Sequence, residues 1–124
     1  MSVTAIGKGV RISPRKVNVV AALVRGRSVT DATAILEHTP RRAAGAVKKV
    51  VISAKANAEH KHGLKPDSLT IIEISITPGV RYKRYRPAAR GRALPFQRKT
   101  SRIRVVVDGE KRPVKKPAAD KEAS

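Results

Sequence analysis

The stretch that decides the fold runs from residue 71 to residue 108 and reads IIEISITPGVRYKRYRPAARGRALPFQRKTSRIRVVVD. Apolar residues alternate with polar ones at both of its ends, which is typical of half-buried strands. The alternating residues are Ile72, Ile74 and Ile76 at one end and Ile103, Val105 and Val107 at the other. Between them lies a long segment rich in Arg and Lys. The pattern predicts an antiparallel β-hairpin whose two roots pair in a small core and whose middle projects beyond it.

All charged residues of the projecting segment are basic. No acidic residue occurs between Glu73 and Asp108, although ten Arg and Lys residues lie there. The same segment holds every aromatic residue of the chain, namely Tyr82, Tyr85 and Phe96. Cations mixed with aromatic rings suit nucleic acid, because cations pair with phosphates and rings stack on bases. Regular alternation would leave basic side chains on both faces of the hairpin, so neither face suits a protein core.

Charge points to the same kind of partner. The chain has 124 residues and a formal net charge of +19 at pH 7, with a sequence pI near 11.5. So large an excess of like charge repels itself in a compact state unless a polyanion supplies counter-charges. Cysteine is absent, which removes disulfides and zinc fingers and is compatible with a reducing cytosol. No apolar run approaches the ~20 residues of a membrane span, so we expect no membrane partner.

The length suits one domain with a modest core. Aromatic residues make up only 2% of the chain, so the core must be built from small aliphatic side chains. We expect residues 1–108 to form a single α+β RNA-binding domain, in which the extended hairpin spans about residues 78–104. Residues 109–124 are rich in Lys, Pro, Ala and acids, and we expect them to form a disordered tail.

Three helices are expected between an N-terminal edge strand, Val3 to Ile12, and the hairpin. Each begins with a Ser or Thr that can cap its first turn, and proline follows the first and third caps. The expected caps are Ser13, Thr30 and Thr39. Apolar residues recur at helical spacing after each cap, so each helix has one face to bury. These residues are Val17, Val20, Ala21, Val24, Ala32, Ile35, Leu36, Ala43, Val47, Val50, Val51, Ala54 and Ala58. Gly63 is expected to end the third helix.

The tip of the hairpin is expected at residues 88–92, where Gly91 allows a positive φ. Pro87 and Pro95 flank this tip. Because proline cannot donate a ladder hydrogen bond, the two prolines predict broken pairing and a widened loop near the end.

Catalysis and metal binding are disfavoured. Ser13 and Lys16 have the Ser-x-x-Lys spacing of serine acyl-transfer enzymes, but a helix cap explains Ser13 and no further motif follows. His60 and His62 are two residues apart and would face different directions on a helix, which argues against a shared metal ion. We therefore expect no enzymatic activity, no cofactor and no metal site.

An architectural DNA-bending protein is the alternative function. Such proteins also join a helical body to basic β-arms that enter a groove of the duplex. Their arms usually end in an apolar wedge or a proline, whereas the tip here reads Arg90-Gly91-Arg92. The tip therefore favours RNA over bent DNA.

Three segments carry a family resemblance: residues 11–17 (RISPRKV), 53–60 (SAKANAEH) and 83–93 (KRYRPAARGRA). In this order and spacing they resemble the large-subunit ribosomal protein family twenty-two of the bacterial type, over Val3 to about Val107. The resemblance implies three helices packed on a small antiparallel β-sheet, with a long hairpin that reaches into large-subunit ribosomal RNA and helps line the nascent-peptide exit tunnel. It also implies a structural constituent of the large ribosomal subunit, located in the cytoplasm, that supports assembly of the RNA.

The resemblance and the charge pattern together imply a set of binding residues. The expected ribosomal RNA contacts are Lys8, Arg11, Arg15, Lys16, Arg81, Tyr82, Lys83, Arg84, Tyr85, Arg86, Arg90, Arg92, Phe96, Arg98, Lys99 and Arg102. The implied tunnel-facing tip is Ala88, Ala89, Arg90, Gly91, Arg92 and Ala93. The chain departs from the family's usual residues at Tyr85, Ala88 and Pro95. Large-subunit ribosomal RNA, neighbouring large-subunit proteins and the nascent polypeptide are the implied partners, and we expect no homo-oligomer.

Overall fold

The computed structural model describes residues 2–87 and 89–110. Its strands are β1 (Ser2–Val10), β2 (Thr70–Pro87) and β3 (Ala93–Asp108), and its helices are α1 (Pro14–Val24), α2 (Val29–His38) and α3 (Arg42–His62). Short 3-10 turns lie at Pro66–Ser68 and Ala89–Gly91. This is the α+β fold with a long hairpin that the sequence predicted.

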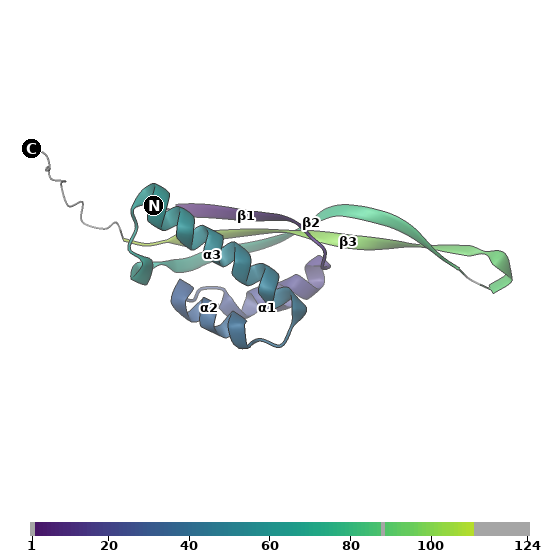
Figure 1. The fold of residues 1–124 in the computed structure, drawn as a ribbon, viewed down its shortest axis with the longest axis horizontal. Helices are drawn as coiled ribbons and strands as arrows, with labels where there is room; N and C mark the ends of the chain where they lie inside the picture. The colour runs from purple at the N-terminus through teal and green to yellow at the C-terminus, as the bar shows by residue number, and fades with distance from the viewer. Residues whose placement is uncertain (1, 88, 111–124) are drawn as a thin grey trace, which may run out of the picture.

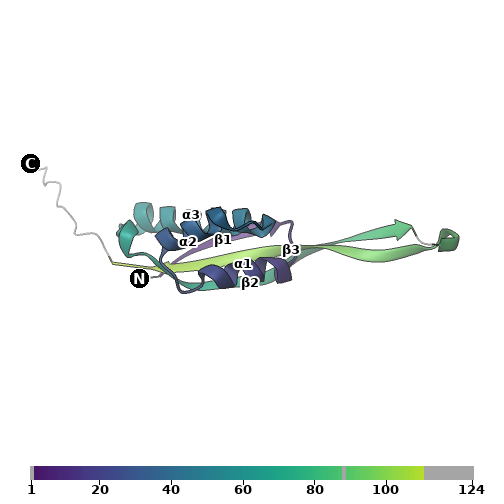
Figure 2. The same cartoon turned by 90° about the horizontal axis from the view of Figure 1, so that it is seen from below.

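The three strands form one antiparallel sheet in the order β1-β3-β2. β1 is an edge strand, as predicted, and β3 is central because both other strands pair with it. The helices α3 and α1 lie against the sheet, and α2 packs on both of them (Figures 1 and 2). β2 and β3 continue together far beyond β1 and the helices (Figure 1). The fold therefore has a body, which holds the helices, and a projecting ribbon.

The core of the body is aliphatic throughout. It joins residues from the inner face of the sheet, such as Ile71, Ile103 and Val105, to the predicted apolar stripes of the helices. Within the described residues no aromatic side chain and no residue between 77 and 100 belongs to this core. The described core of the body is therefore built without side chains from the ribbon.

One predicted core position is wrong. Ile72 is 51% exposed, whereas its neighbour Ile71 is fully buried. The pairing of β2 with β3 shifts by one residue between Ile71 and Glu73, so a β-bulge interrupts the alternation there. Because the bulge inserts one extra residue, the inward-facing position moves from Ile72 to Ile71.

Two predicted caps are also wrong. Ser28, not Thr30, caps α2: its Oγ accepts a hydrogen bond from the backbone N–H of Asp31 at 3.3 Å. Thr39 ends α2 instead of beginning α3, and its Oγ1 donates to the carbonyl of Ile35 at 2.6 Å. A threonine hydroxyl can satisfy either end of a helix, and the preceding turn uses this one first.

The end of α3 follows the prediction. Gly63 adopts φ 62° in the left-handed region, and the backbone N–H of Leu64 donates to the carbonyl of Ala58 at 3.0 Å. Such a bond across the last turn satisfies a carbonyl that the helix leaves free.

The chain beyond β3 is held to the body at its start. The backbone N–H of Lys65 donates to the carbonyl of Glu110 at 2.8 Å, and the N–H of Glu110 donates to Ser68 Oγ at 2.9 Å. The remainder of the predicted tail, residues 111–124, lies outside the described residues. Among the helices that are described, none is both long and apolar enough to cross a membrane.

Candidate nucleic-acid interface

A β-bulge separates the body from the ribbon, which we call the arm and define as residues 79–100. The bulge places Gly79 and Val80 opposite the single residue Thr100, because the pairing shifts by one residue there. Thr100 is 4% exposed, and its Oγ1 donates to the carbonyl of Val80 at 2.6 Å. A Cβ at position 79 would lie 2.6 Å from that Oγ1, so glycine allows this close approach. The bulge sets the faces of the strands that follow.

Pairing beyond the bulge is regular, from Arg81 opposite Lys99 to Pro87 opposite Ala93. The predicted break in pairing at Pro87 and Pro95 is therefore wrong. Pro95 pairs with Tyr85, and Pro87 pairs with Ala93, two residues further along the ladder. Because hydrogen-bonded and non-hydrogen-bonded pairs alternate, these two pairs are of the same kind. In a ribbon of two strands the amide of such a residue can face outward, where a missing N–H breaks no ladder bond.

One face of the arm holds rings between guanidinium groups. The guanidinium carbon of Arg86 lies 5.0 Å from the ring centre of Phe96, and that of Arg98 lies 5.8 Å from the same ring. Arg84 lies 5.7 Å from the ring centre of Tyr82. These separations fall within the range of cation–π attraction. The contacts hold three arginines in an extended array.

The opposite face of the arm carries a ring without such a partner. Alternation from the bulge places Arg81, Lys83 and Tyr85 on this face, with Lys99 and Pro95 opposite the first and the last. Tyr85 is 70% exposed and has no part in the arm's cation–π contacts. An exposed ring beside cations is suited to stacking on a nucleic-acid base.

The tip turns through two residues with positive φ, Arg90 at 61° and Gly91 at 72°. The positive φ of Gly91 was predicted, whereas that of Arg90 was not. The N–H of Arg92 donates to the carbonyl of Ala89 at 3.5 Å. A left-handed arginine is strained, and strain of this kind is often found at functional positions. Ala88, the first residue of the expected tip, lies outside the described residues.

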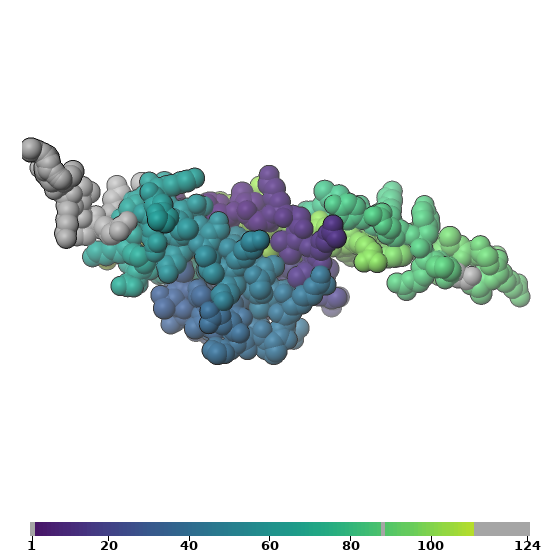
Figure 3. All heavy atoms as spheres, in the orientation of Figure 1, coloured from purple at the N-terminus to yellow at the C-terminus, as the bar shows by residue number. Residues whose placement is uncertain are grey.

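In the described part of the chain, no ion pair includes a cation of the arm. The ion pairs Lys48–Glu37, Lys65–Glu110 and Arg104–Glu73 all lie in the body. Figure 3 shows the arm extending clear of the body, so the arm's side chains face the solvent. Every described residue from 81 to 95 is exposed.

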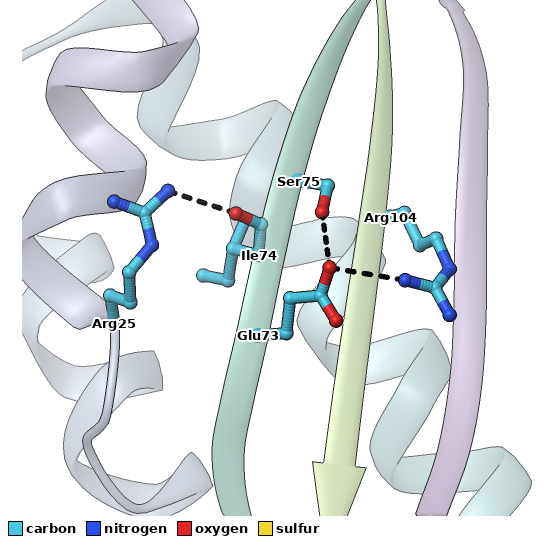
Figure 4. A network of polar contacts seen from close by, with 5 residues as sticks. All are labelled: Arg25, Glu73, Ile74, Ser75 and Arg104. Carbon is cyan, nitrogen blue, oxygen red and sulfur yellow. Dashed lines mark hydrogen bonds and ion pairs between the residues drawn. The ribbon is translucent and has the colours of Figure 1, made fainter.

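Arg104, by contrast, is used within the protein (Figure 4). Glu73 Oε2 accepts hydrogen bonds from Ser75 Oγ at 2.6 Å and from Arg104 Nη1 at 3.2 Å. The bond from Ser75, followed by the charge and hydrogen bond of Arg104, lowers the pKa of the Glu73 carboxyl. On the other edge of β2, Arg25 Nη2 donates to the carbonyl of Ile74 at 2.8 Å. This bond satisfies a carbonyl at the edge of the sheet.

The body contributes cations at the root of the arm. Arg11, Lys16, Arg41 and Arg42 line a hollow of about 490 Å³ together with Gln97, Arg98 and Lys99 from the arm. Arg15 lines a neighbouring hollow with Arg81 and Lys99. The structure thus brings Arg11, Arg15 and Lys16 to the arm, while Lys8 and Arg102 are exposed on β1 and β3.

Arg41 and Arg42 were not among the expected contacts. No local pattern in the sequence connects them to the arm residues about 55 positions later. The Ser13–Lys16 spacing is the first turn of α1, as the cap interpretation predicted, although the Ser13 side chain makes no cap hydrogen bond. In the described part of the chain no three His, Asp or Glu residues are placed to hold a metal ion.

A sheet-and-helix body with an exposed cationic arm, in which rings alternate with guanidinium groups, is the architecture of a nucleic-acid-binding protein. The particular family can be stated as well. The chain belongs to the ribosomal protein L22p/L17e family, whose model matches residues 5–108.

Two curated relatives support this assignment. The large ribosomal subunit protein uL22 of Oceanobacillus iheyensis is 49% identical over 111 residues, which cover 90% of this chain and 98% of the relative. The protein of the same name from Desulforamulus reducens is 47% identical over 111 residues, with the same coverage.

Proposed function

We propose that this protein is a non-catalytic, structural constituent of the large ribosomal subunit, which binds large-subunit ribosomal RNA through its arm. The observation that carries the proposal is the arm itself. It lies outside the core, no ion pair among the described residues includes one of its cations, and its described residues from 81 to 95 are exposed. An isolated two-stranded ribbon is marginal in water, so this one needs a partner that surrounds it.

Binding follows from electrostatics and stacking. Each RNA phosphate that pairs with an Arg or Lys releases condensed counterions, which favours binding most at low salt. Arg84, Arg86 and Arg98 already lie over rings, so their guanidinium planes are partly ordered before RNA arrives. Tyr85 offers a free ring to an unstacked base. The protein would act passively, by holding folded RNA together as the subunit assembles in the cytoplasm.

The tip has the finer role in this proposal. Ala89 to Ala93 form the end of the arm, farthest from the body, with Arg90 and Gly91 in left-handed backbone. An arm surrounded by RNA would bring only this end through to the exit tunnel, where the nascent polypeptide passes. The body, which remains at the surface of the RNA, would meet neighbouring large-subunit proteins.

The test compares the full chain with a variant whose arm is shortened. Residues 84–96 are replaced by Asn-Gly, which joins the paired residues Lys83 and Gln97 through a two-residue turn. Both proteins are titrated with large-subunit ribosomal RNA and with length-matched duplex DNA over a range of salt.

The variant lacks Arg84, Arg86, Arg90 and Arg92. If all four contact phosphates, the log–log salt slope for ribosomal RNA should become shallower by about 3–4. Preference of the full chain for ribosomal RNA, lost in part by the variant, is the expected result. Equal or tighter binding of duplex DNA by the full chain would refute the proposal and favour an architectural DNA-binding protein.

A further inference from the structure

The hollow at the root of the arm is built from three segments that are distant in sequence, residues 11–16, 41–43 and 97–99. The segment before α1 contributes Arg11, α1 contributes Lys16, the start of α3 contributes Arg41 and Arg42, and β3 contributes Arg98 and Lys99. A second hollow of about 350 Å³ continues from it and shares Arg11, Arg42, Arg98 and Lys99. We call the two hollows together the root groove.

The lining of the root groove carries one sign of charge. Its described residues include cations, Ser13, Gln97, Thr100, Tyr82 and small or apolar groups, but no carboxylate. The ion pairs of the body involve none of its cations. Seven positive side chains that converge without a counter-charge among the described residues repel one another. A fold that keeps them together is suited to an anion that enters between them.

The two helices that reach the groove add to its positive potential. α1 and α3 both begin there, and neither has an acidic residue in its first turn or a side-chain hydrogen bond at its cap. Cations at the start of a helix oppose the helix dipole, so Lys16 and Arg42 lie where helix stability alone would favour acids. A cation in the first turn is unfavourable for the stability of each helix, and both helices begin at the same groove. A binding role accounts for this departure.

We propose that the root groove binds the phosphate backbone of an RNA segment, as a site where the body meets the base of the arm. The inference rests on the proposed function and adds Arg41 and Arg42 to it. A single small anion would leave most of the seven cations unpaired, whereas a polymer with repeated phosphates can pair with cations along both hollows. RNA is therefore the occupant that the groove fits.

The walls of the groove are more firmly fixed by packing than the part of the arm between Lys83 and Gln97. Two of its walls are fixed by packed elements, because Val17 and Val20 of α1 and Ala43 and Ala44 of α3 are buried in the core. The third wall, Arg98 and Lys99 of β3, begins directly beside the bulge. The groove is thus present before RNA binds. Arg84 is the one described residue of the groove that lies between Lys83 and Gln97, so we infer that the groove still contacts RNA when residues 84–96 are removed.

The test uses the full chain with paired substitutions. Arg41→Gln/Arg42→Gln removes two groove charges, and Lys49→Gln/Lys61→Gln removes two exposed charges from the same helix outside the groove. Binding of large-subunit ribosomal RNA is measured against salt. Loss of two phosphate contacts should make the slope shallower by about 1.4–1.8, which corresponds to about 15- to 30-fold weaker binding at ~0.15 M salt. The control should differ from wild type by less than half as much.

Folding is checked by thermal melting of each variant. Removal of positive charge from the start of α3 relieves a clash with the helix dipole, so the melting temperature should not fall. A second variant, Arg11→Gln/Lys16→Gln, removes charge from the opposite wall and should weaken binding by a similar factor. If Arg41→Gln/Arg42→Gln lowers the melting temperature, RNA binding by Arg11→Gln/Lys16→Gln decides whether the groove binds RNA.

The outcomes separate the two proposals. If wild-type protein shows no preference for large-subunit ribosomal RNA over duplex DNA, the proposed function fails. If that preference is present but both groove variants bind like the control, the function stands and the groove proposal is refuted. RNA binding that persists in the shortened-arm variant and disappears when Arg41→Gln/Arg42→Gln is added to it would support the groove directly.

Discussion

Substitution of Gly7 by alanine tests how α3 is placed on the sheet. Gly7 lies in β1, and a Cβ there would lie only 2.5 Å from Val50 Cγ2 of α3. The backbone of Gly7 is not left-handed, so the expected cost is steric. Overpacking of this kind costs about 1–3 kcal/mol, and reduced freedom of the unfolded chain returns about 0.4–1 kcal/mol. We expect a net loss of about 1–2 kcal/mol, which for a body of this size lowers the melting temperature by about 4–16 °C.

Two further variants make this result specific. Val50→Ala alone should destabilise the protein, because Val50 is 6% exposed and loses buried methyl groups. Combined with Gly7→Ala it should cost less than the sum, with a coupling of about 0.5–1 kcal/mol or more in urea unfolding. Gly45→Ala is the control: nothing lies within 4 Å of its Cβ, and the exposed helical site should gain about 0.5–1 kcal/mol. A neutral Gly7→Ala, or strict additivity with Val50→Ala, would refute the steric reasoning.

Three other predictions concern the arm and the sheet. Tyr85→Ala should weaken RNA binding by about 1–3 kcal/mol without changing the melting temperature, because the ring is exposed, whereas Phe96→Ala should also speed amide exchange in the arm. Thr100→Val should cost about 0.5–1.5 kcal/mol in urea unfolding and loosen the bulge, since the carbonyl of Val80 loses its partner. Glu73→Gln should destabilise the protein at neutral pH, and this loss should shrink at acidic pH. The pKa of Glu73 is lower in the folded state than in the unfolded state. The stability that the Glu73 carboxylate contributes is therefore present above the unfolded-state pKa and is lost as pH falls through the folded-state pKa. Equal destabilisation at neutral and acidic pH would contradict this.

The helices could be predicted because their signal is local. Apolar spacing identified every buried residue of α1 and all those of α3 except Ala44, and Gly63 marked the end of α3. Helix starts were less certain, since Thr39 can serve the end of one helix or the beginning of the next. The burial of Ile71 instead of Ile72 was not predictable from alternation, because a bulge depends on the partner strand.

Charge composition predicted the arm, but not the groove. An acid-free segment with all the rings is visible in the sequence, and its pairing follows from the alternation at its roots. Arg41 and Arg42 meet Arg98 and Lys99 only after α3 has packed across the sheet. That contact depends on tertiary packing, for which a single sequence provides no pattern.

The groups that stabilise the fold and most cations of the hairpin lie in different parts of the molecule. The aliphatic core and the ion pairs lie in the body, while most cations of the hairpin segment extend into solvent, where repulsion between them does not strain the core. The root groove is the exception, because there the cations are held by packed helices. Repulsion in the groove therefore acts against the folded body itself, and an RNA phosphate that relieves it stabilises the body as it binds. Repulsion in the arm acts only against the arm. RNA that binds the arm alone is therefore expected to order the arm and leave the stability of the body unchanged.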